Sequence, residues 1–65
     1  MAWVACDENG QEAIFSGKPD RVEYSGEFMN IWFDYNGMFI NLPSGSIEKL
    51  IGRKLTWEDE PVEVR

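Results

Sequence analysis

The sequence predicts a mainly β fold, a small α+β domain in which two Asn-Gly β-hairpins and a C-terminal strand form a curled sheet or small barrel. One observation behind this is that Asn9-Gly10 and Asn36-Gly37 each lie between apolar runs, and Asn-Gly favours a two-residue hairpin turn because both positions tolerate a positive φ. The other is a stretch at about 46–51 whose apolar residues have helical spacing. We therefore expect a single domain over residues 1–65 with one short helix.

The first hairpin is predicted from the apolar runs 1–6 and 11–16 on either side of Asn9-Gly10. With these two residues as the loop, Val4 lies opposite Phe15. Both faces of this hairpin are largely apolar. We therefore expect it to be covered on two sides, by the rest of the domain on one and by a helix or a partner on the other.

A brief edge strand at 22–24 precedes the second predicted hairpin, whose strands span 28–35 and 38–42. The second Asn-Gly turn places Phe33 opposite Ile40 on one face, which is predicted to be core. The opposite face mixes polar and aromatic side chains, and it carries Phe28, Asn30, Trp32, Asp34, Phe39 and Asn41. This face is the most informative surface in the sequence.

The C-terminal third is expected to hold the helix and the last strand. Ser46 is predicted to cap a helix over 46–51, and Gly52 suits the residue just past its end. The apolar residues of this helix share one face that should pack on the sheet, and they are Ile47, Leu50 and Ile51. A strand start is predicted at 55–57, and a terminal edge strand at 62–64.

The composition argues against an enzyme. The chain has 65 residues, 12 acidic and 6 basic side chains, no histidine and a net charge of −6. Without histidine, Ser-His-Asp and Cys-His arrangements cannot form, and the sequence has no glycine-rich phosphate-binding loop. No Ser, Tyr or Lys has a neighbour that would make it a nucleophile. We therefore expect no catalytic activity and no cofactor.

The same composition bears on metals, nucleic acids and stability. The only cysteine is Cys6, so the chain lacks both an intramolecular disulfide and a zinc ligand set. We expect Cys6 to be a small core side chain opposite Ala13. A net charge of −6 repels a phosphate backbone, so direct nucleic-acid binding is not expected. A chain this short buries only about 60% of its unfolded surface, which makes a homo-oligomer the remaining source of stability.

The sequence also predicts a location. It has neither an apolar run of about 18 residues nor a basic start followed by an apolar stretch, which excludes a membrane-spanning helix and a secretory signal. We therefore expect a cytoplasmic protein that does not contact a membrane.

Two parts of the chain carry a family resemblance. One is the segment 42–64, LPSGSIEKLIGRKLTWEDEPVEV. The other part lies near the start, and its residues are Trp3, Val4, Ala5, Asp7, Gly10, Glu12, Ile14, Phe15, Lys18, Pro19 and Arg21. Together they resemble a large set of short uncharacterised proteins encoded by phages and mobile elements of gut anaerobes. The middle of the chain, 22–41, is particular to this sequence.

The resemblance implies a phage or prophage context, and therefore the cytoplasm of an infected or prophage-carrying bacterial host. It implies no catalytic residue. Small phage proteins of this size commonly act by binding a host protein or an immune signalling molecule. We therefore predict a non-catalytic phage-type binding module that inhibits or sequesters a host component, as a counter-defence (anti-immune) protein.

The mixed face of the second predicted hairpin is the first candidate site, and its partner-binding residues are Phe28, Trp32, Phe39 and Asn41. Aromatic side chains flanked by polar ones are typical of interface cores. The alternative is that Trp32 and Phe39 are buried under the helix. Asn30, Asp34 and Asn41 on the same face would be costly to bury without partners, which favours an interface.

Two basic loops form the second candidate, an anion or nucleotide site. One loop carries Lys18 and Arg21, and the other carries Arg53 and Lys54. If the loops approach and a tryptophan stacks on a base, the protein would be a homo-oligomeric sponge for a nucleotide immune signal. The alternative is that all four residues are ordinary surface charges.

Two acidic clusters, at 7–12 and 58–60, form the third candidate, a mimic of nucleic acid or a Ca²⁺ or Mg²⁺ site. Asp7-x-Asn9 followed by Gly10 does not match the spacing of a calcium loop. The alternative is that both clusters are solvated turns that keep a small protein soluble.

Overall fold

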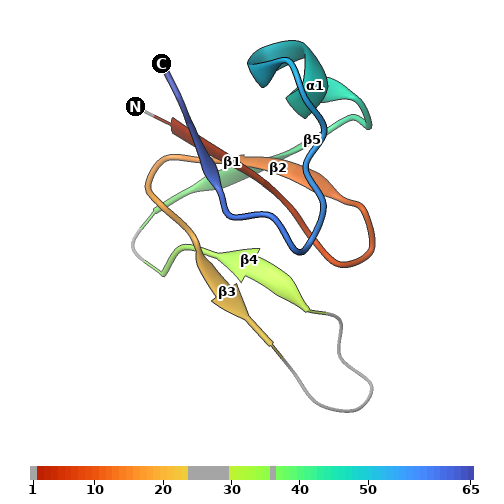
Figure 1. Ribbon diagram of the computed structural model, residues 1–65. Coiled ribbons are helices and arrows are strands. Elements are labelled where there is room, and N and C mark those ends of the chain that lie inside the picture. Colours follow the sequence, from red (N-terminus) through yellow and green to blue (C-terminus); the bar gives the residue numbers. More distant parts are fainter. Residues whose placement is uncertain (1, 24–29, 36) are drawn as a thin grey trace.

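The structure is a computed structural model that describes residues 2–23, 30–35 and 37–65 (Figure 1). Its elements are β1 Ala2–Cys6, β2 Glu12–Phe15, β3 Asp20–Val22, β4 Ile31–Phe33, β5 Phe39–Leu42, α1 Ser46–Ile51 and β6 Val62–Val64. A four-stranded antiparallel sheet has the order β5-β2-β1-β6, and β3 and β4 form a second antiparallel sheet. The mainly β fold with one short helix is therefore confirmed, as an open curled sheet and not a closed barrel.

The first hairpin forms as predicted, but its register differs by one residue. Val4 pairs with Ile14 and not with Phe15. The reason is a three-residue loop, in which Gly10 has a φ of 89° and donates its N–H to the Asp7 carbonyl oxygen (2.9 Å). This is the geometry of a type I turn followed by a left-handed residue, and it replaces the expected two-residue loop.

The second predicted hairpin does not form, because its two strands belong to different sheets. β4 pairs with β3, where Trp32 lies opposite Arg21, and β5 pairs with β2, where Phe39 lies opposite Phe15. The predicted pairing of Phe33 with Ile40 is therefore wrong. β4 pairs with the strand that precedes it in the chain, and β5 pairs with the more distant β2, because β2 and β3 offer edges that the turn signal at 36–37 does not reveal. Asn36 itself lies outside the described residues.

Helix α1 has the predicted bounds and the predicted end. Gly52 follows it with a φ of 82° and donates its N–H to the Glu48 carbonyl oxygen (2.9 Å). The expected cap at the other end is wrong, because the N-cap position is Gly45 and not Ser46. Instead, the Glu12 carboxylate of β2 accepts the N–H groups of Gly45 and Ile47, each at 2.8 Å.

The predicted strand start at 55–57 is a turn in the structure. The Asp59 carboxylate accepts the Thr56 N–H at 2.8 Å, and the Asp59 N–H donates to the Thr56 carbonyl oxygen at 3.0 Å. These local bonds satisfy backbone groups that a strand would have offered to a neighbour. The terminal edge strand is confirmed, since β6 pairs with β1.

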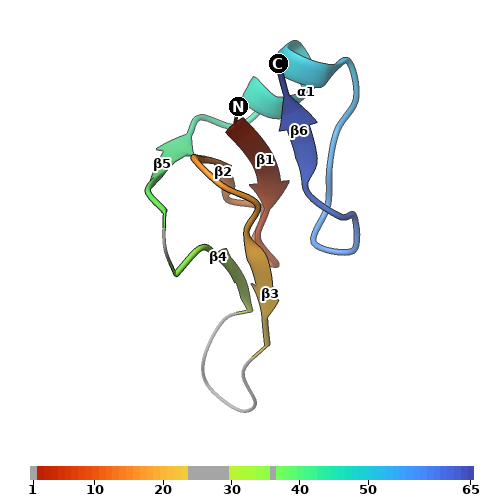
Figure 2. The same ribbon diagram turned by 90° about the vertical axis from the view of Figure 1, so that its left-hand side faces the viewer.

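Both faces of the β1–β2 hairpin are covered (Figure 2). On one face Val4 and Cys6 pack against Ile47 of α1 and against Leu55. On the other face the sheet packs against Trp32, and its buried residues there are Ala5, Ala13 and Phe15. The two-sided cover predicted for the first hairpin is therefore confirmed. In the described part of the chain, no helix has the length and apolarity needed to cross a membrane.

Candidate functional site

A cavity of about 360 Å³ lies between the two sheets, and we call it the aromatic–amide cavity. Its aromatic lining consists of Phe15, Trp32, Phe33 and Phe39. Its polar lining consists of Asp7, Asn9, Gln11 and Asn41, and Ala13 and Ile31 complete it. Apolar walls with a few convergent polar groups are the usual composition of a binding site, and the volume lies within the usual range.

Hydrogen bonds hold the inner wall of this cavity in place. The Trp32 indole N–H donates to the Cys6 carbonyl oxygen (3.0 Å), and the Trp32 backbone N–H donates to the Asp7 carboxylate (2.9 Å). The N–H of Glu8 donates to the Asn30 carbonyl oxygen (3.3 Å). The loop that follows β1 is therefore tied to β4, and Trp32 is buried.

The outer wall of the cavity is open to solvent. Phe39 stacks on Phe15 with ring centroids 5.6 Å apart, yet 49% of its surface is exposed. Asn41 is also exposed on the same strand, β5. A molecule that entered the cavity would therefore meet Phe39 and Asn41 before the fixed inner wall.

Three of the four residues predicted for partner binding line this cavity. Phe39 and Asn41 come from β5, whereas Trp32 comes from β4 of the other sheet. They therefore lie on opposing walls and not on one hairpin face, and Trp32 is buried without being covered by α1. Phe28 lies outside the described residues.

The loop between β1 and β2 contributes polar groups that sequence reasoning did not assign to this site. Asp7, Asn9 and Gln11 all line the cavity. The sequence shows them only as a turn cluster, and their neighbours across the cavity depend on the packing of the second sheet. The run of polar residues around the Asn9-Gly10 turn was the one available signal.

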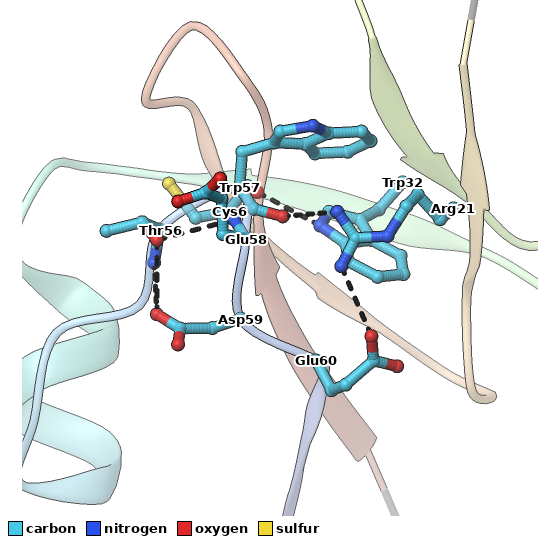
Figure 3. A network of polar contacts seen from close by, with 8 residues as sticks. All are labelled: Cys6, Arg21, Trp32, Thr56, Trp57, Glu58, Asp59 and Glu60. Carbon is cyan, nitrogen blue, oxygen red and sulfur yellow. Dashed lines mark hydrogen bonds and ion pairs between the residues drawn. The ribbon is translucent and has the colours of Figure 1, made fainter.

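Arg21 belongs to a structural cluster (Figure 3). Its guanidinium lies against the rings of both Trp32 and Trp57, 4.4 and 4.6 Å from their centroids, and these two rings also contact each other, with centroids 5.4 Å apart. One nitrogen donates to the Trp57 carbonyl oxygen (2.6 Å), and another pairs with the Glu60 carboxylate (3.2 Å). These contacts join β3 and β4 to the 55–60 segment, and Glu60 already pairs with the charge that an anion site would need.

The other basic residues predicted for a nucleotide site make contacts different from those of Arg21. Lys18 places its ammonium 5.7 Å from the centroid of the Trp3 ring. Arg53 and Lys54 are exposed after α1, and Lys54 lines a different cavity. Within the described part of the chain, none of the contacts of these residues joins the two basic loops.

That second cavity, of about 450 Å³, lies beside α1 and has an acidic lining. It includes Asp7, Glu8, Glu12 and Glu48. Glu12 is already bonded to the start of α1, and no group of three or more Asp, Glu, Cys or His side chains among the described residues is placed to hold a metal ion. In the C-terminal acidic cluster, Asp59 bonds Thr56 and Glu60 pairs with Arg21.

Two groups near these cavities have shifted pKa values. Burial raises the pKa of the Cys6 thiol, and the negative charges of Glu12, Asp7 and Asp59 raise it further. Cys6 therefore stays protonated, which suits a core residue and not a nucleophile. Burial also raises the pKa of Asp7, although the hydrogen bond from the Trp32 N–H opposes that shift.

Comparison of the chain with known proteins adds no homologue to this description. The proposed function therefore rests on the chemistry of the cavity, of its lining and of the Arg21 cluster. No protein-family model, no curated protein and no solved structure matches the chain.

Proposed function

We propose that the protein is a non-catalytic binding module whose aromatic–amide cavity holds an anchor side chain of a protein partner. The observation that carries the proposal is the half-exposed Phe39 at the mouth of a cavity whose inner wall is fixed by Trp32. Interface hot spots pair buried anchors with such pockets, and aromatic residues dominate them. Binding of this kind would inhibit or sequester the partner.

The lining also defines the chemistry of the anchor. Aromatic side chains from Phe33 and Phe39 suit an apolar or cationic side chain, and the Asn41 amide can bond its polar end or its backbone. The Gln11 amide already donates to the Glu12 and Leu42 carbonyl oxygens (2.9 and 3.1 Å), so its oxygen is the group that can accept a hydrogen bond from the anchor. The carboxylate of Asp7 on the wall and the net charge of −6 favour a basic partner surface. An arginine or tyrosine on such a surface fits these requirements best.

The cavity favours a protein partner over a nucleotide. The described residues that line it include no Lys or Arg, and Asp7 would repel a phosphate group. The resemblance to phage proteins supports a host protein as the partner and counter-defence as the biological role. The nucleotide sponge and the nucleic-acid mimic have no comparable geometric support.

Site-specific photo-crosslinking tests this proposal. Benzoylphenylalanine would replace Phe39 in one version of the protein and Leu50 of α1 in the control, because both positions are 49% exposed. After irradiation in host extract, we expect an adduct with a specific protein from position 39 only. That adduct should weaken as salt is raised, because screening reduces attraction between an acidic and a basic surface. Equal adducts from both positions, or none from position 39, would refute the proposal.

A further inference from the structure

β5 is an edge strand that carries no charged residue. It ends the order β5-β2-β1-β6, and Figure 2 shows it at the edge opposite β6. Met38 and Ile40 are 79% and 67% exposed there. The sequence contains no charged residue between Tyr35 and Ile47. Natural edge strands usually carry charges or bulges or are covered against pairing, so an uncharged edge with exposed apolar residues is a candidate for pairing with another strand.

The ladder determines which backbone groups the edge offers. Ser16 donates its N–H to the Met38 carbonyl oxygen (2.9 Å), so the backbone of Met38 faces β2. Since consecutive residues of an antiparallel strand turn their backbone groups to opposite sides, Ile40 also faces β2. The N–H and C=O groups of Phe39 and Asn41 therefore point to the free edge.

We propose that β5 pairs antiparallel with β5 of a second copy, about a two-fold axis at Ile40. Phe39 of one molecule then exchanges both backbone hydrogen bonds with Asn41 of the other, and the reverse pair is equivalent by symmetry. On one face Ile40 packs against Ile40, and Met38 packs against Leu42 of the second copy. One molecule leaves Met38 and Ile40 largely exposed and Leu42 partly buried.

The charge distribution supports a second copy as the occupant of this edge. Each molecule carries a net charge of −6, which opposes self-association in general. The edge, however, lies within the uncharged segment from Tyr35 to Ile47, so the pairing brings no carboxylates directly opposite each other. An isologous interface requires a self-complementary patch, and an antiparallel strand with alternate apolar residues provides one.

Pairing would also extend the binding site. Phe39 and Asn41 share the face of the sheet that lines the aromatic–amide cavity. In the dimer, Phe39 of each molecule lies beside Asn41 of the other on that face. The two cavities therefore border one continuous groove across the axis, and each molecule contributes residues to it. This inference stands on the edge geometry and does not require the proposed partner.

The mass of the protein in solution is the first test. Sedimentation equilibrium should give twice the chain mass of 7.5 kDa at micromolar concentration. Ile40→Lys should raise the dissociation constant on the order of 100-fold, because it places two like charges at the axis. Leu50→Lys makes the same apolar-to-lysine change at an exposed position of α1, and it should leave the dimer intact. A monomer at every concentration, or equal loss in both variants, would overturn the proposal.

Disulfide trapping tests the register. Ile40→Cys should form a covalent dimer under mild oxidation, since residues opposite each other at a non-hydrogen-bonded pair bring their side chains close. Leu50→Cys should remain monomeric on a denaturing gel, and native Cys6 is buried in both proteins. A dimer by mass in which Ile40→Cys does not crosslink would overturn the axis at Ile40. A monomer that still crosslinks a host protein from position 39 would overturn the dimer and leave the proposed function standing.

Discussion

Arg21 shows how one side chain can hold two parts of a small protein together. Its guanidinium lies against the rings of Trp32 and Trp57 while it bonds the Trp57 carbonyl oxygen and Glu60. A lysine ammonium could keep the charge, but it could not stack on both rings and bond both oxygens. The sequence identified Arg21 only as one of four residues of a possible anion site, because its aromatic partners come from other segments of the chain.

We expect Arg21→Lys to lower the free energy of unfolding by about 1–2 kcal/mol, through loss of stacking and of one hydrogen bond. Urea unfolding followed by tryptophan fluorescence measures this change. Arg53→Lys is the matched control, because Arg53 is exposed and the substitution is the same. If the two variants unfold at the same urea concentration, the Arg21 cluster does not stabilise the fold.

The carboxyl group of Asp7 makes the stability of the fold depend on pH. Its pKa in the folded protein is raised above the ordinary value of 3.8 by burial, so the folded state binds the proton more tightly than the unfolded chain. Stability from this group is therefore fully present below pH 3.8, and it is lost as the pH rises through the folded pKa.

Asp7→Asn should remove that loss, because the amide oxygen can still accept the Trp32 N–H without carrying a charge. We expect the variant to be more stable than the wild type at pH 7 and equal to it in strong acid. Unfolding curves across this pH range measure the difference. A variant that is less stable at pH 7 would show that the ionised carboxylate favours the fold.

At the scale of elements, local sequence patterns predicted well which segments form strands and the helix. They predicted less well which strands pair with each other. The first hairpin, the helix ending before Gly52 and the terminal strand follow from nearby residues. The partners of β4 and β5 do not, since an Asn-Gly turn signal says nothing about the free edges of β2 and β3. The cavity followed from that pairing, so only three of its residues were found from the sequence.

The start of α1 is a contact between elements that sequence reasoning missed. A six-residue helix has little stability of its own, and Glu12 of β2 bonds the N–H groups of Gly45 and Ile47. The sequence signal for this contact was the carboxylate of Glu12 in an otherwise apolar run. That run lies far from the helix along the chain. Its role depends on tertiary structure alone.

Glu12→Ala should therefore lower the free energy of unfolding by about 1–3 kcal/mol, because it leaves backbone donors of α1 without their carboxylate. Glu12→Gln should lose less, since one amide oxygen can still accept. Urea unfolding measures both, with exposed Glu58→Ala as the control. Equal stability of the wild type and Glu12→Ala would contradict the role of Glu12 as a cap.

At the scale of the whole molecule, the residues that stabilise the fold differ from the exposed residues of the proposed binding site. The inner wall of the aromatic–amide cavity is fixed by Trp32 and Asp7, whereas Phe39 and Asn41 stay exposed on an edge strand. Substitutions of the exposed pair should therefore change binding far more than unfolding. In Figure 1 the second sheet lies across from α1, so each layer covers one face of the central sheet.

The affinity for the partner that crosslinks from position 39 tests the central claim most directly. Titration calorimetry would compare the wild type with Phe39→Ala and with the control Leu50→Ala, after urea unfolding shows that all three are folded. We expect Phe39→Ala to weaken binding by about 10- to 100-fold, as loss of a hot-spot aromatic does, and Leu50→Ala to bind like the wild type. Unchanged affinity in Phe39→Ala, or an equal loss in Leu50→Ala, would contradict a binding site at the aromatic–amide cavity.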